Sequence, residues 1–283
     1  MRGRGLYLTI FFISIFVLVP MAFAEDGGPV ASKEASKAEI PEAGPAETVD
    51  ALIARADELM KGTAALYLEN ELEKIAQSIE FYEKALQEDS DNFEATWKVA
   101  KSHFFYAEES RKRSVPGWQK ICEEYGRRGM AYAENAVSLG PDEPNGYYYF
   151  ALNVGTYKDG VGLLTAIKEG LKDKTQKNLE KAYELDKTFD KAGVILALGR
   201  FWQVLPWPLN DKDKAMAYYR EFQKTPYFVA PKNVQGHIYL AEMLKDQWGG
   251  EPKKEAKKLL NDVLEITDDP HWEEKAKKLL AAF

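Results

Sequence analysis

Apolar residues recur at intervals of three and four along most of the chain, which is the spacing of one helix face. From Thr48 onward this pattern is almost continuous, and no window alternates apolar and polar residues as a half-buried strand would. Proline and glycine gather at the junctions between periodic segments, as at Gly140-Pro141 and Gly249-Gly250. The pattern predicts an all-α protein.

One arrangement of residues returns five times along this helical pattern. A small residue is followed four residues later by a second core position, usually large, and three residues after that by a third apolar residue. The trios are Ser78/Tyr82/Ala85, Gly129/Ala133/Ala136, Thr175/Leu179/Ala182, Ala215/Tyr219/Phe222 and Ala256/Leu260/Val263. A small residue lets two helix backbones approach closely, and a large one fills the opposite groove. Repetition of one unit predicts helical hairpins that bury their apolar faces against neighbouring hairpins.

The repeats resemble tetratricopeptide repeats (TPRs), which are helix–turn–helix units of about 34 residues. Here the last residues of the trios fall at 85, 136, 182, 222 and 263, so successive copies lie 40 to 51 residues apart. The excess falls mainly between the paired helices, around 107–125, 156–174 and 203–212. The resemblance implies an α-solenoid of about four to five degenerate TPR-like hairpins, with elongated helices or long connections.

The N-terminal segment is predicted to be an export signal. Arg2 and Arg4 precede a largely apolar stretch over 6–19, and a small-x-small cleavage motif ends at Ala24. We therefore expect a signal peptide at 1–24, a disordered linker at 25–47, a repeat domain at 48–283, and a periplasmic location. The apolar stretch is short for a membrane span, so an uncleaved anchor is the less favoured alternative. There is no cysteine near the cleavage site, so attachment of a lipid to the N-terminus is not expected.

The composition and the absence of known motifs argue against several classes of function. The net charge is −7, and loss of the leader with its two arginines changes it to −9, which argues against bulk binding of nucleic acid. Cys122 is the only cysteine, so no intrachain disulfide is expected. The three histidines are scattered, and no catalytic or phosphate-binding motif is present. We expect no metal, no cofactor and no enzymatic activity.

The first helices of TPR hairpins build the inner face of a solenoid. Projecting the usual inner positions onto this sequence gives a candidate ligand or partner groove that is largely apolar and aromatic. Its residues are Trp97, Lys101, Phe104, Tyr148, Leu152, Val194, Leu198, Trp202 and Ile238, with Asn153 beside them. One interpretation is a groove for a small apolar ligand or a partner surface. The alternative is ordinary core, because aromatic stripes at helical spacing usually pack inside. Asn153 would either clamp an adjacent loop or face a ligand.

The leader, the elongated repeats, the run YYYFALNVG at 147–155 and the loop LPWPLNDKDKA at 205–215 together resemble one family. It is the TPR-like T-component (TatT) associated with tripartite ATP-independent periplasmic (TRAP) transporters. The resemblance implies a non-catalytic accessory protein that binds a periplasmic solute-binding protein or another exported protein, with an apolar ligand in the groove. The alternative is a general envelope scaffold without a small ligand. The oligomeric state stays open, and a homo-oligomer is compatible with the sequence.

Overall fold

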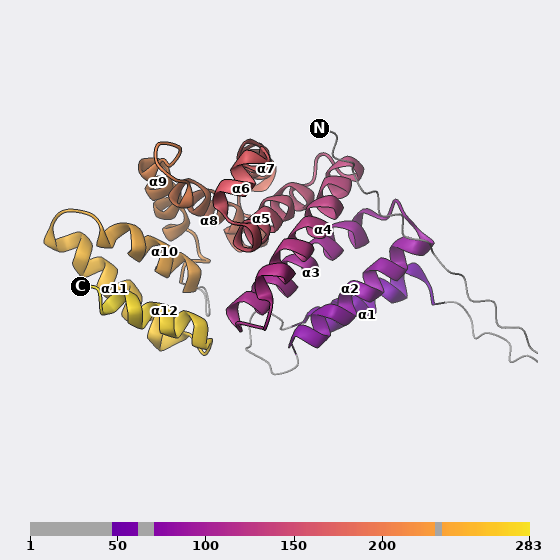
Figure 1. The fold of residues 1–283 in the computed structure, drawn as a ribbon, viewed down its shortest axis with the longest axis horizontal. Coiled ribbons are helices and arrows are strands. Elements are labelled where there is room, and N and C mark those ends of the chain that lie inside the picture. Colours follow the sequence, from indigo (N-terminus) through magenta and orange to yellow (C-terminus); the bar gives the residue numbers. More distant parts are fainter. Residues whose placement is uncertain (1–46, 62–70, 230–233) are drawn as a thin grey trace, which may run out of the picture. The chain divides into compact units, whose positions relative to one another are not determined.

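The computed structural model describes residues 47–61, 71–229 and 234–283, and every regular element within them is an α-helix (Figure 1). These helices all belong to one compact unit, Ala46–Phe283. The predicted signal peptide at 1–24 and nearly all of the predicted linker at 25–47 lie outside the described residues. The all-α prediction is confirmed for the part of the chain that is described.

Ten of the helices in the described residues form five consecutive hairpins. The hairpins are α1 (Val49–Met60) with α2 (Glu71–Glu88), α3 (Phe93–Lys112) with α4 (Trp118–Leu139), α5 (Pro144–Val161) with α7 (Leu171–Asp186), α8 (Phe189–Val204) with α9 (Lys212–Gln223), and α10 (Val234–Lys245) with α11 (Gly250–Ile266). The short α6 (Leu163–Lys168) lies inside the third hairpin, and α12 (Pro270–Leu280) follows the fifth. Each second helix packs on the first helix of the next hairpin, which is the predicted solenoid order.

The repeated trios occupy the helix–helix contacts. All fifteen of their residues are buried, on α2, α4, α7, α9 and α11. Gly129 shows why the first member is small, because a Cβ there would lie 2.0 Å from Oδ1 of Asn153 on the neighbouring α5. Gly126, one turn earlier, faces the backbone of Tyr157 almost as closely. Small side chains on α4 thus set its close approach to α5.

Local signals explain where several helices begin. The side chains of Thr48, Asn92 and Asp211 accept hydrogen bonds from the first free backbone N–H groups of α1, α3 and α9. Helix α4 begins after Gly117 and α7 after Gly170, and both glycines have positive φ, which costs glycine little. Each of these residues is of the type that favours the start of a helix.

The extra length of the repeats is accommodated in three ways. In the second hairpin it lengthens the helices, so that α3 and α4 have 20 and 22 residues. In the third hairpin it forms α6, and in the fourth it forms the proline-rich turn around Trp207, which is 85% exposed. No helix of the described residues combines the length and the apolar character needed to cross a bilayer.

Candidate functional site

A cavity of about 1500 Å³ lies against the first helices of several hairpins. Three of the predicted groove residues line it: Phe104 on α3 and Tyr148 and Leu152 on α5. Further apolar lining comes from α8, α10 and α12, through Ala197, Phe201, Tyr239 and Trp272. The structure therefore brings part of the predicted groove together and adds the last helix to its wall.

Four other predicted residues lie in the interior and do not line the cavity. Val194, Leu198 and Ile238 are fully buried, and Trp202 is 8% exposed. On α8 the residues that line the cavity include Leu196, Ala197 and Phe201, whereas the neighbouring Leu198 and Trp202 are buried in the core. One residue on a helix corresponds to a rotation of about 100°, which turns a lining position into a core position.

The other end of the predicted groove is an aromatic cluster. Trp97 stacks on Tyr149, with ring centroids 5.9 Å apart and an interplanar angle of 9°. Nζ of Lys101 lies 5.9 Å from the centroids of both Trp97 and Phe105. Burial lowers the pKa of Lys101, and the carboxylate of Asp190 opposes that shift. Neither Trp97 nor Lys101 lines the cavity.

Asn153 joins two helices. Its Nδ2 donates hydrogen bonds to the backbone oxygen of Ala100 on α3, at 3.0 Å, and to that of Tyr149 one turn earlier on α5, at 2.8 Å. The residue is fully buried, and its Oδ1 has no hydrogen-bond partner among the residues that the structure describes. Of the two roles considered for Asn153, its contacts fit the clamp, although it clamps a helix and not a loop.

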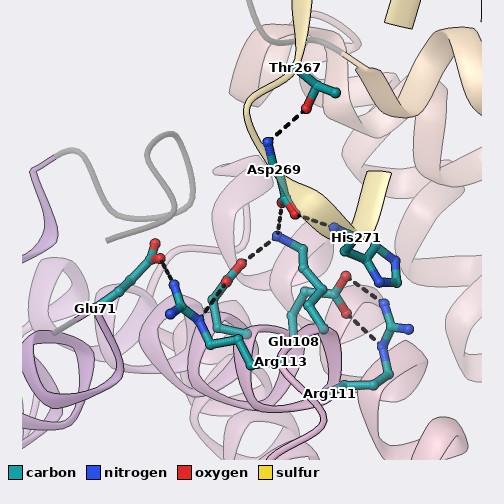
Figure 2. Close-up of polar contacts among 9 residues, drawn as sticks. Glu71, Glu108, Arg111, Arg113, Thr267, Asp269 and His271 are labelled. Atoms are coloured by element: carbon teal, nitrogen blue, oxygen red, sulfur yellow. Dashed lines mark hydrogen bonds and ion pairs between the residues drawn. The ribbon is translucent and has the colours of Figure 1, made fainter. Parts of the chain in front are cut away.

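Charged side chains at the end of α3 form the polar wall of the cavity (Figure 2). Nζ of Lys112 lies 2.5 Å from Oε1 of Glu109 and 3.2 Å from Oδ2 of Asp269, which precedes α12. Arg113 contacts Glu109 at 3.5 Å and Glu71 of α2 at 2.5 Å. We call Glu71, Glu109, Lys112, Arg113 and Asp269 the bridging network, because it joins α2 and α3 to the turn before α12.

Burial makes this network sensitive to the loss of any member. The side chains of Glu71, Glu109 and Lys112 are 1%, 2% and 6% exposed. Burial alone would lower the pKa of Lys112, but Glu109 and Asp269 outweigh that effect and raise it. Lys112 is therefore held as a cation, and removal of a partner would leave a buried charge without compensation.

Members of two further ion-pair groups line the same cavity. Arg111 pairs with Glu108 at 2.8 Å and with Asp159 of α5 at 3.3 Å. Burial alone would raise the pKa of Glu108, and the guanidinium of Arg111 outweighs this and lowers it.

The second ion-pair group is centred on Glu242 of α10. This residue accepts from Arg200 of α8 at 2.8 Å and from Lys275 of α12 at 2.9 Å. Because these charges are paired with one another, the site offers apolar contacts and fixed hydrogen-bonding groups rather than an exposed nucleophile.

Sequence reasoning missed the bridging network. The run EESRKR at 108–113 does indicate ion pairs, because acidic and basic residues three positions apart form pairs on one helix. Such runs usually lie on solvated faces, and nothing near them in the sequence predicts a partner 157 residues away. Among the described residues, no group of three or more histidine, cysteine, aspartate or glutamate side chains could hold a metal ion.

Solved structures similar to this chain are TPR proteins. TTC0263, a thermophilic TPR protein of Thermus thermophilus, is 15% identical, with a TM-score of 0.54, and the match covers 80% of this chain and 99% of that one. YrrB, a TPR protein with an unusual peptide-binding site, is 15% identical with a TM-score of 0.41, covering 82% and 93%. PilW, a type IV pilus biogenesis factor, is 13% identical with a TM-score of 0.38, covering 82% and 98%. The likeness to TTC0263 shows the TPR fold.

Comparison of sequences identifies the family. None of the curated proteins matches the chain. Residues 52–204, which span α1 to the end of α8, match the family described as regulator of microtubule dynamics protein 1-3. The match covers more than half of the chain, and the chain therefore belongs to the family of regulator of microtubule dynamics proteins 1–3.

Proposed function

We propose that this protein is a non-catalytic binding module that holds an apolar ligand, or an apolar segment of a protein partner, in the cavity. The observation that carries the proposal is the cavity itself. Its volume of about 1500 Å³ exceeds the roughly 300–1,000 Å³ of common small-molecule sites. Apolar side chains line it, and its charged side chains are largely engaged in ion pairs.

The fold supports the protein-binding half of this proposal. Stacked TPR hairpins present an extended concave surface built from first helices, and such surfaces bind other proteins and peptides. Here Phe104, Tyr148 and Leu152 stand on that surface, within the cavity. The same residues were projected from the sequence as part of a groove, so two independent arguments lead to them.

Mass spectrometry of the natively purified protein tests the ligand. We expect a co-purifying apolar molecule or peptide in the wild type and its loss in Leu152→Glu, which places a charge on the cavity wall. Ala197→Trp should also remove it, by filling the space. Leu164→Glu is the matched control, because Leu164 is 65% exposed on α6 and does not line the cavity. Equal retention in all four proteins would refute the site.

A narrower proposal concerns the partner. The residues that resemble the TRAP T-component support binding to a periplasmic solute-binding protein, together with export through the N-terminal leader. The test is a co-sedimentation measurement of the mature chain with the solute-binding protein of a TRAP system from the same organism. A stable complex that Leu152→Glu weakens would support this role. Sedimentation of two independent species would reject binding to the solute-binding protein and would leave the cavity proposal unaffected.

The family match brings a second candidate function. The family description names microtubule dynamics, and the matched residues 52–204 include the aromatic cluster and most of the cavity wall from α3, α5 and α8. A pelleting assay with stabilised microtubules tests whether that role extends to this chain. Co-pelleting that saturates with tubulin concentration would favour it, and protein left in the supernatant would exclude it.

A further inference from the structure

The bridging network joins helices that are far apart in the sequence. Lys112 ends α3, in the second hairpin, and Asp269 stands directly before α12, at the end of the chain. The helices that pack along α3 are α2, α4 and α5, whereas α12 packs on α10 and α11. The Lys112–Asp269 ion pair joins the end of α3 to the turn before α12 (Figure 2).

The same side chains form part of the cavity wall. Glu71, Glu109, Lys112 and Asp269 all line the cavity, as do Thr267 and His271 on either side of Asp269. Ion pairs therefore line the wall where the two ends meet, as they also do between α3 and α5 and between α8 and α10. An ion pair between side chains can break without disturbing the packing of any hairpin. Stacked helices cannot separate without losing their packed apolar contacts.

Asp269 is held firmly on its own side of the contact. Its Oδ1 accepts a hydrogen bond from the backbone N–H of His271 at 2.9 Å, which caps α12, while its backbone N–H donates to Oγ1 of Thr267 at 3.1 Å. Its Oδ2 is left to accept from Lys112 at 3.2 Å. Lys112 is fixed on the other side by Glu109. Two preorganised groups thus meet through one ion pair.

We propose that the Lys112–Asp269 ion pair is a gate, which holds the two ends together along one wall of the cavity and restricts the entry of a ligand. The role of this gate in controlling ligand entry rests on the proposed function. The gate itself is a property of the structure that can be measured without any ligand.

The test measures access to the cavity through a cysteine placed inside it. In a Cys122→Ser background, which removes the only natural thiol, Ala197→Cys puts a thiol on the cavity wall. Its rate of reaction with a bulky maleimide reports how accessible the cavity wall is to a large reagent. Adding Lys112→Met or Asp269→Asn should raise that rate at least about tenfold. Asparagine retains the cap on α12, so Asp269→Asn removes the ion pair with little effect on the helix.

Two controls separate opening from unfolding. Leu164→Cys, on the exposed surface, should react at one rate in every background. Lys258→Met breaks an exposed pair with Asp262 and should leave the Ala197→Cys rate unchanged. Far-ultraviolet circular dichroism must show native helix content in each variant that is compared.

A short bismaleimide joining Lys112→Cys to Asp269→Cys provides the opposite perturbation. It should slow the entry of the fluorescent apolar dye ANS, or prevent it. The gate is overturned if Lys112→Met and Asp269→Asn are folded and react at the wild-type rate. If both variants open the cavity but the natively purified protein holds no ligand, the proposed function fails while the gate stands.

Discussion

Acid should destabilise this protein through one buried histidine. His103 of α3 is fully buried between the rings of Tyr125 and Tyr132, whose centroids each lie 5.4 Å from its own. Its Nδ1 lies 2.9 Å from the backbone oxygen of Val99, while its Nε2 has no hydrogen-bond partner within the described part of the chain. The carbonyl can only accept, so Nδ1 carries the proton of the neutral ring. A second proton on Nε2 would be a buried charge.

The magnitude follows from the pKa difference between the folded and unfolded states. Burial lowers the pKa of His103 from 6.5 to about 4 in the folded protein. Between these values the unfolded chain binds the proton and the folded chain does not, so stability is present above the unfolded pKa and is lost as pH falls. Integration gives a loss of about 2 kcal/mol at pH 5 relative to pH 7, and about 3 kcal/mol at pH 4.

The variant His103→Phe isolates this contribution. Phenylalanine retains an aromatic ring between the two tyrosines and cannot be protonated. We expect the urea-derived free energy of unfolding to fall by about 2 kcal/mol less between pH 7 and pH 5 in the variant than in the wild type. Carboxylates titrate in both proteins, so their contributions cancel in the difference. Parallel curves for the two proteins would refute the assignment, whatever the stability of the variant at neutral pH.

Three further predictions concern a thiol, a pair of glycines and a core leucine. Burial raises the pKa of Cys122 to about 12, so iodoacetamide should leave it unmodified in the native protein and alkylate it in guanidinium. Gly126→Ala should lower the free energy of unfolding by about 1–3 kcal/mol, because the new Cβ would lie 2.6 Å from the backbone nitrogen of Tyr157. Gly155→Ala should instead raise it by about 0.5–1 kcal/mol, since nothing lies within 4 Å of its Cβ position. Leu198→Ala, in the fully buried core, should lower it by about 2–5 kcal/mol, and chemical denaturation measures all three substitutions.

The repeat register could be predicted from the sequence because it depends on local spacing. A small residue at Gly129 or Ala256 and a large one at Tyr219 or Leu260 follow from the need of adjacent helices to approach and to fill space. Every member of the five trios is buried as this reasoning requires. The same spacing could not show which side of a first helix lines the cavity.

Helix α8 illustrates the difficulty. Asp190, Lys191 and Ala192 at its start have φ of 49° to 60°, in the left-handed region. None of them is a glycine, and each such residue costs about 1–2 kcal/mol, so no sequence rule anticipates this turn. A left-handed turn changes the phase of the helix that follows. Projection of the usual inner positions selected Leu198, which is buried in the core, whereas its neighbour Ala197 lines the cavity.

The contact between Lys112 and Asp269 also changes how the protein should unfold. Repeat arrays commonly behave as one-dimensional chains, in which terminal repeats fray independently and stability is a sum over nearest neighbours. A bond between distant repeats adds a term that no nearest-neighbour sum contains. Unfolding of the C-terminal helix would remove the counter-charge of Lys112, so fraying of α12 would destabilise the end of α3. Amide hydrogen exchange in α12 and in the last turn of α3 should consequently rise and fall together.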